Sequence, residues 1–119
     1  ITAQTGIKSL DVTIDCDNLD ARELGTMGIP ARFDLCNIEG FEDTNGTMHP
    51  AEDVREAISA LGFPIEDAVK DKPSIRLKID KIFTGLLTGF PGNNNFILTV
   101  TENNGLSTTK TLKYYVPAN

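Results

Sequence analysis

Tryptophan is absent from this sequence, and six Phe and two Tyr bring the aromatic content only to 7% of 119 residues. A core with so few large rings must be built mainly from Ile, Leu and Val. Such a core suits a thin pair of packed layers better than a roomy cofactor pocket. The length is that of one domain, so we expect residues 1–119 to share one core.

Histidine occurs once, as His49, and no nucleophile motif such as G-x-S-x-G is present. Acid–base or nucleophilic catalysis needs an oriented partner group, so His49, just before Pro50, is interpreted as a loop or capping residue. Seventeen carboxylates are too many to single out a glycosidase pair, which also needs a cleft for the sugar. The sequence therefore predicts a protein that is not an enzyme, and a small hydrolase is the most distant hypothesis.

Only two cysteines are present, Cys16 and Cys36, and they have no CxxC spacing. Without a CxxC motif, the two cysteines support neither a zinc site nor thioredoxin-like chemistry. Two interpretations stay open: two small buried hydrophobic side chains, or one disulfide.

Long apolar runs are also missing: no stretch is long enough to span a bilayer, and no signal-peptide core stands at Ile1. The chain opens directly on a predicted strand, Ile1–Gln4. We therefore expect a fragment of a larger secreted or surface protein.

Charge is unevenly spread within a net charge of −6. Residues 1–71 hold 15 acidic and 5 basic side chains, whereas residues 72–119 hold 2 acidic and 6 basic ones. An acidic surface repels the phosphate backbone, and the basic residues form no run, so nucleic acid is not an expected partner. The scattered basic residues are interpreted as solvated strand faces.

Alternation of apolar and polar residues predicts strands with one buried face. The clearest runs are Leu10–Cys16, Phe33–Cys36, Ile75–Ile79, Phe96–Val100 and Leu112–Val116. Asn103-Asn104-Gly105 between the last two predicts a tight hairpin, with both turn residues at positive φ.

Helical signals interrupt this pattern twice. Asn18 or Asp20 is placed to cap a short helix that ends at Gly25. Pro50–Leu61 carries an apolar stripe, acidic residues in its first turn and Gly62 after its end. Residues 39–48 are predicted to form a loop turning at Asn45-Gly46, and Ile82–Leu87 a turn of helix or a crossover.

Together these elements predict a mainly β fold, an antiparallel β-sandwich of the immunoglobulin-like type with one or two short helices inserted between early and late strands. A parallel sheet is not expected, because its strands would be continuous apolar runs.

The predicted final hairpin, residues 96–112, resembles the closing hairpin of bacterial immunoglobulin-like, cadherin-like or PKD-like domains, which often read F-x-V-x-V-T-D-x-N-G before a Thr-rich return strand. Residues 6–15, 33–35 and 61–64 resemble uncharacterised surface lipoproteins of Bacteroidetes. The resemblance covers most of the chain in style and order, and carries no catalytic signature.

The resemblance implies an extracytoplasmic parent protein, at the cell surface or anchored to the outer membrane, with several domains. It implies contact with the membrane only through a lipid anchor outside residues 1–119. The sequence departs from the pattern in two ways: it has no lipobox cysteine, and Glu102 stands where the common pattern has Asp, which weakens a calcium site of the cadherin kind.

Asp15, Asp17 and Asp20 form the best candidate metal site, because alternating carboxylates at a strand end supply the oxygen ligands that Ca²⁺ prefers. The glycine and distal glutamate of an EF-hand are missing, and helix capping explains Asn18 and Asp20 equally well. No other cofactor is expected.

Phe41 and Phe90 in loops and Tyr115 on the last strand are candidates for stacking on sugar rings, although loop phenylalanines often anchor a loop to the core. The function expected is thus a non-catalytic extracellular structural or interaction module, with neighbouring domains of the same chain and a protein or polysaccharide ligand as partners. The alternative is a carbohydrate-binding module of a glycan-utilisation surface system.

Overall fold

The computed structural model describes residues 2–78, 81–82 and 90–117. In chain order the elements are β1 (Ile7–Cys16), α1 (Ala21–Thr26), β2 (Arg32–Asp34), β3 (Phe41–Glu42), β4 (Met48–His49), α2 (Ala51–Ala60), a 3-10 turn (Glu66–Ala68), β5 (Gly92–Glu102) and β6 (Ser107–Val116).

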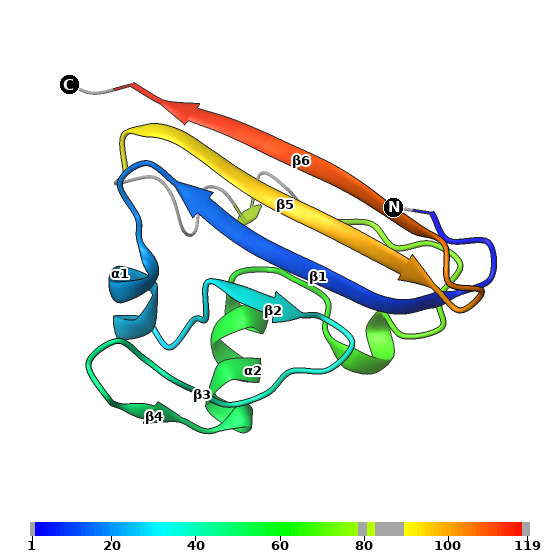
Figure 1. The fold of residues 1–119 in the computed structure, drawn as a ribbon, viewed down its shortest axis with the longest axis horizontal. Coiled ribbons are helices and arrows are strands. Elements are labelled where there is room, and N and C mark those ends of the chain that lie inside the picture. Colours follow the sequence, from blue (N-terminus) through cyan, green and yellow to red (C-terminus); the bar gives the residue numbers. More distant parts are fainter. Residues whose placement is uncertain (1, 79–80, 83–89, 118–119) are drawn as a thin grey trace.

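One antiparallel sheet with the strand order β2-β1-β5-β6 dominates the fold, and β3 and β4 form a separate two-stranded sheet (Figure 1). The three long strands run side by side along the 44 Å longest dimension of the molecule. α1 and α2 lie in sequence between β1 and β5. The prediction of a mainly β, antiparallel fold with two short helices between early and late strands is confirmed.

The core lies against one face of the large sheet. Leu10, Val12 and Ile14 of β1 are buried, and the residues opposite them on β5 are Val100, Leu98 and Phe96. Leu24 of α1 and the α2 residues Val54 and Ile58 belong to the same buried cluster. The predicted two-residue alternation is thus confirmed on both strands, and the predicted apolar stripe of the second helix does cover the sheet.

Both helices begin close to their predicted starts. Asp20 accepts a hydrogen bond from the Glu23 N–H at 3.0 Å and caps α1. Pro50 occupies the N-cap position of α2, which lies within the predicted Pro50–Leu61. The predicted stop at Gly25 is wrong: Gly25 is buried inside α1, and Gly28, with φ of 76°, is the residue in the left-handed region.

The hairpin between β5 and β6 is confirmed, but its turn differs from the prediction. Gly105 has φ of 92°, whereas Asn104 is not among the residues with positive φ. The Gly105 N–H donates to the Glu102 carbonyl and the Glu102 N–H to the Leu106 carbonyl. This is a three-residue loop, a type I turn followed by a left-handed glycine, rather than a two-residue turn.

The strand predicted over residues 75–79 is wrong in its described part, and the strand predicted over Ile1–Gln4 is only partly confirmed. The strand predicted over 75–79 is wrong for Ile75–Lys78, which belong to no strand, although Ile75 and Leu77 are the less exposed residues of the segment. Alternation reports burial on one side and not membership of a sheet: Ile75 and Leu77 line a groove together with Leu98 and Leu112 of the large sheet. Among the described residues of the predicted first strand, Thr2 forms a single bridge, with Ser74.

The predicted loop 39–48 contains the β3–β4 hairpin, with its turn around Asn45-Gly46 as expected. The turn or crossover predicted over Ile82–Leu87 falls largely on residues 83–89, outside the described part of the chain. Within the described ranges, no helix has both the length and the apolar character needed to cross a membrane.

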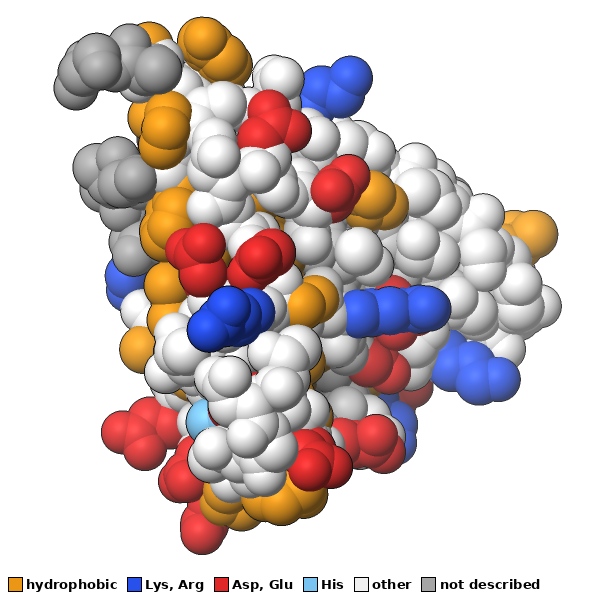
Figure 2. Space-filling view, turned by 60° about the vertical axis from the view of Figure 1, so that its left-hand side comes forward, with side chains coloured by type: hydrophobic (Ala, Val, Ile, Leu, Met, Phe, Trp, Pro, Cys, Tyr) orange, Lys and Arg blue, Asp and Glu red, His pale blue; other side chains and the backbone are white. Residues whose placement is uncertain are grey.

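Acidic and basic side chains are unevenly distributed over the surface, as they are along the sequence. Figure 2 shows acidic side chains over much of this face, most densely over its lower part, the end that carries the β3–β4 hairpin in Figure 1. The long strands β5 and β6 contain one carboxylate, Glu102, and two basic residues, Lys110 and Lys113. The two ends of the fold therefore present different surfaces to a partner.

Candidate functional site

A polar corner on the outer face of the large sheet is the best candidate binding surface. The register places Asp15 of β1, Asn95 of β5 and Lys113 of β6 in one row, and Asn93 opposite Tyr115 in the next. Residues two apart on a strand share a face, so all five side chains stand on the face away from the core.

Exposure within this corner is high. Tyr115 is 65% exposed, and Asp15, Asn93 and Lys113 are exposed as well. An exposed ring beside two amides, a carboxylate and an ammonium offers a flat apolar surface ringed by hydrogen-bond donors and acceptors. That combination suits a polar ring-shaped ligand such as a sugar.

Asp17 holds one side of this corner in place. Its Oδ2 accepts hydrogen bonds from the Asn93 backbone N–H at 2.9 Å and from Asn93 Nδ2 at 3.4 Å. Gly92 is required beside it, because a Cβ at that position would lie 2.9 Å from Asp17 Oδ2. Asp17 thus ties the end of β1 to the start of β5.

The three aspartates of the predicted calcium site are therefore used separately. Asp15 stands on the outer face of the sheet, Asp17 bonds to Asn93, and Asp20 caps α1. In the described ranges no three His, Cys, Asp or Glu side chains are grouped so that they could hold a metal ion.

The three aromatic candidates are also separated. Phe41, on β3, stacks on the His49 ring at a centroid distance of 4.9 Å and packs against the core. Phe90 packs against the core as well, so the interpretation of loop phenylalanines as anchors fits both. Tyr115 is the candidate that the structure exposes on a broad sheet face.

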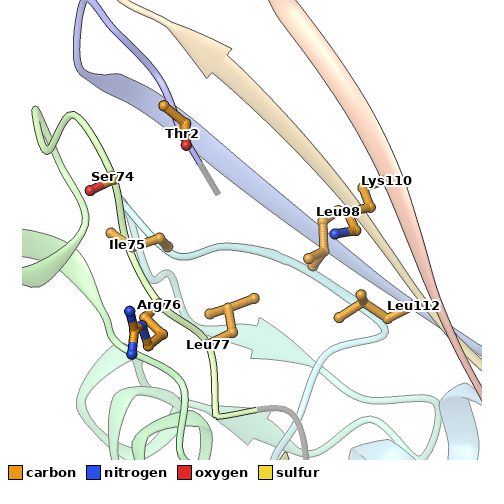
Figure 3. A pocket seen from close by; sticks show the side chains of 8 residues that line it. All are labelled: Thr2, Ser74, Ile75, Arg76, Leu77, Leu98, Lys110 and Leu112. Carbon is orange, nitrogen blue, oxygen red and sulfur yellow. The ribbon is translucent and has the colours of Figure 1, made fainter.

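A groove runs along the opposite face of β6 (Figure 3). It has a volume of about 460 Å³, and its apolar walls face each other, Ile75 and Leu77 on one side and Leu98 and Leu112 on the other. Its lining is completed by Thr2, Ser74, Arg76 and Lys110. A second groove of similar volume lies beside β2 and includes Phe41.

The structure pairs the lone histidine with a carboxylate, which the sequence patterns did not predict. His49 Nε2 lies 2.8 Å from Asp43 Oδ2, and the Asp43 side chain is only 4% exposed. Asp43 Oδ1 accepts from the N–H groups of Asn45 and Thr47. The signal was present, since Asp43 and His49 flank the Asn45-Gly46 turn, but a turn does not reveal which side chains meet across it.

This pairing gives a pH dependence that can be measured. The hydrogen bond from His49, then those from Thr47 and Asn45, hold the pKa of Asp43 below its usual value. A carboxylate whose pKa is lower in the folded state contributes stability that is full above its unfolded pKa of about 3.9 and is lost as the pH falls through the folded value.

We therefore expect Asp43→Asn, which keeps an acceptor oxygen but removes the charge, to flatten the loss of stability on acidification. Urea midpoints measured between pH 6 and about pH 2.5 would fall less steeply in the variant than in the wild type. Glu42→Gln, an exposed charge removal one residue away, is the control and should leave the slope as in the wild type. Equal slopes for Asp43→Asn and the wild type would contradict the assignment.

The disulfide that the sequence left open does not form. Both thiols are free. The Leu35 N–H donates to the Leu10 carbonyl, and the Cys36 thiol lies beside the Leu10 backbone. Cys16 is six residues further along β1, about 20 Å away at the rise of a strand, far beyond disulfide reach.

Burial also makes both thiols poor nucleophiles. It raises the pKa of Cys16, and burial with the nearby Asp34 carboxylate raises the pKa of Cys36 to about 11. At pH 8 we expect iodoacetamide to alkylate Cys36 about two orders of magnitude more slowly than an ordinary thiol, since only the thiolate reacts. Peptide mass spectrometry would follow each site, and the guanidinium-unfolded chain is the control. A fast reaction in the folded protein, or an intramolecular disulfide after mild oxidation, would contradict this.

The fold defines a mainly β protein built on one four-stranded antiparallel sheet. No family model, no curated protein and no solved structure matches the chain. Function must therefore be inferred from the geometry of this chain alone.

Proposed function

We propose that the chain is a non-catalytic structural or interaction module of the immunoglobulin-like sandwich type, in an extracytoplasmic surface lipoprotein, where it positions neighbouring domains. The observation that carries the proposal is the placement of the two ends of the described chain at opposite ends of the long sheet. A module with that geometry holds the domain on its N-terminal side apart from the domain on its C-terminal side.

The bonds at each end fix this placement. Thr5 bonds to Glu102 through its N–H, at 3.2 Å from Oε1, and its carbonyl accepts from Asn103 Nδ2 at 2.9 Å. Val116 pairs with Gly92, ten residues further back along β5. At the rise of an antiparallel strand the two ends are about 33 Å apart.

The immunoglobulin-like assignment is supported by the antiparallel pairing throughout the large sheet and by the position of the late hairpin β5–β6 beside the early strand β1. The inward alternation on β1 and β5 fits a sheet that packs against a second layer. In the described part of the chain, Leu24 of α1 and Val54 and Ile58 of α2 share the buried cluster with the inward side chains of β1 and β5.

The experiment is a replacement within the full reading frame, expressed in its own cell with an epitope tag next to this domain. Protease added to intact cells should remove the tag, and an unrelated β-sandwich of similar end-to-end length should substitute for residues 1–119 without loss of the parent protein's activity. A tag protected until lysis would refute the surface location. Loss of activity in the replacement, with normal expression, would refute the spacer role and indicate a specific ligand.

The exposed Tyr115 corner favours a second candidate, a carbohydrate-binding module. Tyr114 and Tyr115 are neighbours on β6 whose side chains point to opposite faces, so they form a matched pair of variants. We expect affinity electrophoresis through gels containing neutral polysaccharides to show retardation of the wild type. Tyr115→Ala should weaken it about tenfold, because the stacking surface is lost, and Tyr114→Ala should not. Equal retardation of all three, or none, would remove this candidate.

A further inference from the structure

The topology gives β5 a special position, because it is hydrogen-bonded along its length to both of the other long strands. The β1–β5 register runs from Ile7–Glu102 to Cys16–Asn94, and the β5–β6 register runs from Gly92–Val116 to Thr101–Ser107. Both pairings are antiparallel, so β1 and β6 are parallel to each other on the two sides of β5 (Figure 1).

The chain enters β1 at one end of the sheet and leaves β6 at the other. Ile7, the first residue of β1, lies at the end where the β5–β6 turn is, and Val116, the last residue of β6, lies at the end where β5 begins. A force that pulls the two chain ends apart therefore pulls β1 and β6 in opposite directions, each along its own axis.

Pulling in this direction applies shear to both ladders, the row of hydrogen bonds between β1 and β5 and the row between β5 and β6. To slide along β5, a strand must break all of its hydrogen bonds to β5 at nearly the same time, whereas a strand pulled sideways breaks them one after another. Each bond contributes only about 0.5–1.5 kcal/mol net, so the barrier depends on how many must break together. Forced unfolding is governed by that barrier through the unfolding rate.

Sliding is opposed by the core as well. Leu10, Val12 and Ile14 on β1 face the buried layer that includes Val54 and Ile58 of α2. A shift of β1 by one residue would turn these side chains to the outer face, since the side-chain period of a strand is two. Shear must therefore break packing and hydrogen bonds in the same step.

We propose that this domain is a tension-bearing link, in which pulling on the chain ends is resisted by the β1–β5 and β5–β6 ladders acting together. The inference rests on the proposed role as a spacer between domains and adds a mechanical property to it. The segment before Thr5 is outside the ladders: the Ala3 N–H donates to the Pro73 carbonyl at 2.7 Å, and Thr2 forms a single bridge to Ser74. That segment peels away first, without opening the large sheet.

The test is single-molecule pulling of the same protein in two directions. In the first, handles are attached at the two chain ends. In the second, one handle stays at the N-terminal end and the other is attached through an azide-bearing residue at Leu106, which is 61% exposed in the β5–β6 turn at the same end of the sheet. The second direction peels the strands.

We expect the unfolding force in the first direction to exceed that in the second by about twofold or more at equal loading rate. Urea unfolding of both labelled forms should give the same midpoint, which controls for damage by the label. Equal forces, or a larger force in the peeling direction, would overturn the proposal. Such a result would not bear on the spacer role, which the replacement experiment tests separately. If the replacement abolished the parent protein's activity but the unfolding force still depended strongly on direction, the mechanical property would hold without the spacer role.

Discussion

Replacing Phe96 by alanine is expected to lower the free energy of unfolding by about 3–5 kcal/mol. Phe96 is 1% exposed at the centre of the sheet, between Ile14 on β1 and Leu112 on β6, and its ring lies 6.0 Å from that of Phe63. Removing the ring leaves a cavity between the sheet and the opposing layer. A domain of this size has a stability of about 6–18 kcal/mol at typical values per residue, so the loss is a large fraction.

Urea denaturation followed by circular dichroism would measure the change, with Tyr115→Ala as the control. That residue is also an aromatic on the large sheet, but it is 65% exposed, so its removal should cost about 0.5 kcal/mol or less. A small effect at Phe96, comparable with the control, would show that the core is not centred on β5.

Gly6→Ala is expected to be the most damaging single-methyl addition among the positive-φ glycines. Gly6 has φ of 93°, and a Cβ there would lie 2.7 Å from Asn103 Nδ2 and 3.0 Å from the Asp71 carbonyl oxygen. Three segments meet at this point: the Asn103 N–H donates to the Gly6 carbonyl, and Asn103 Nδ2 donates to Asp71 Oδ1. We expect a loss of about 2–4 kcal/mol from strain and steric conflict together.

Gly105→Ala is the matched control. Gly105 has nearly the same φ, 92°, but a Cβ there would meet no atom within 4 Å. It should show the conformational cost alone, about 1–2 kcal/mol. The difference between the two variants measures the steric term at the junction, and equal losses would mean that the neighbours of Gly6 move aside without cost.

Sequence patterns located the elements that have one buried face. β1 and β5 were found because the two faces of each strand meet different surroundings, and a period of two records that difference directly. β6 is exposed along most of its length and was located by the turn before it and by its own alternating residues. α2 was found because its apolar stripe, its acidic first turn and Gly62 all agree. These signals come from residues that are close together in the sequence.

The same signals did not predict features that depend on pairing between segments far apart in the sequence. Ile75–Lys78 alternates like a strand, yet it belongs to none, because alternation reports one-sided burial and not membership of a sheet. For Asp15, Asp17 and Asp20 the structure adds the groups that each one meets: Asp15 stands on the outer face of the sheet, Asp17 bonds to Asn93, and Asp20 caps α1. Cys16 and Cys36 became separate thiols through the antiparallel register of β1 and β2.

The sequence by itself therefore determined the mainly β class, the antiparallel strands, the two helices and the closing hairpin, since each depends on residues near one another in the chain. Only the tertiary structure decided the strand order, the Asp43–His49 pair, the polar corner around Tyr115 and the position of the two chain ends. Those depend on which strands meet and in what register. The pairing and register of the strands minimise the exposed apolar surface of the whole chain, so they cannot be predicted from any short stretch of sequence.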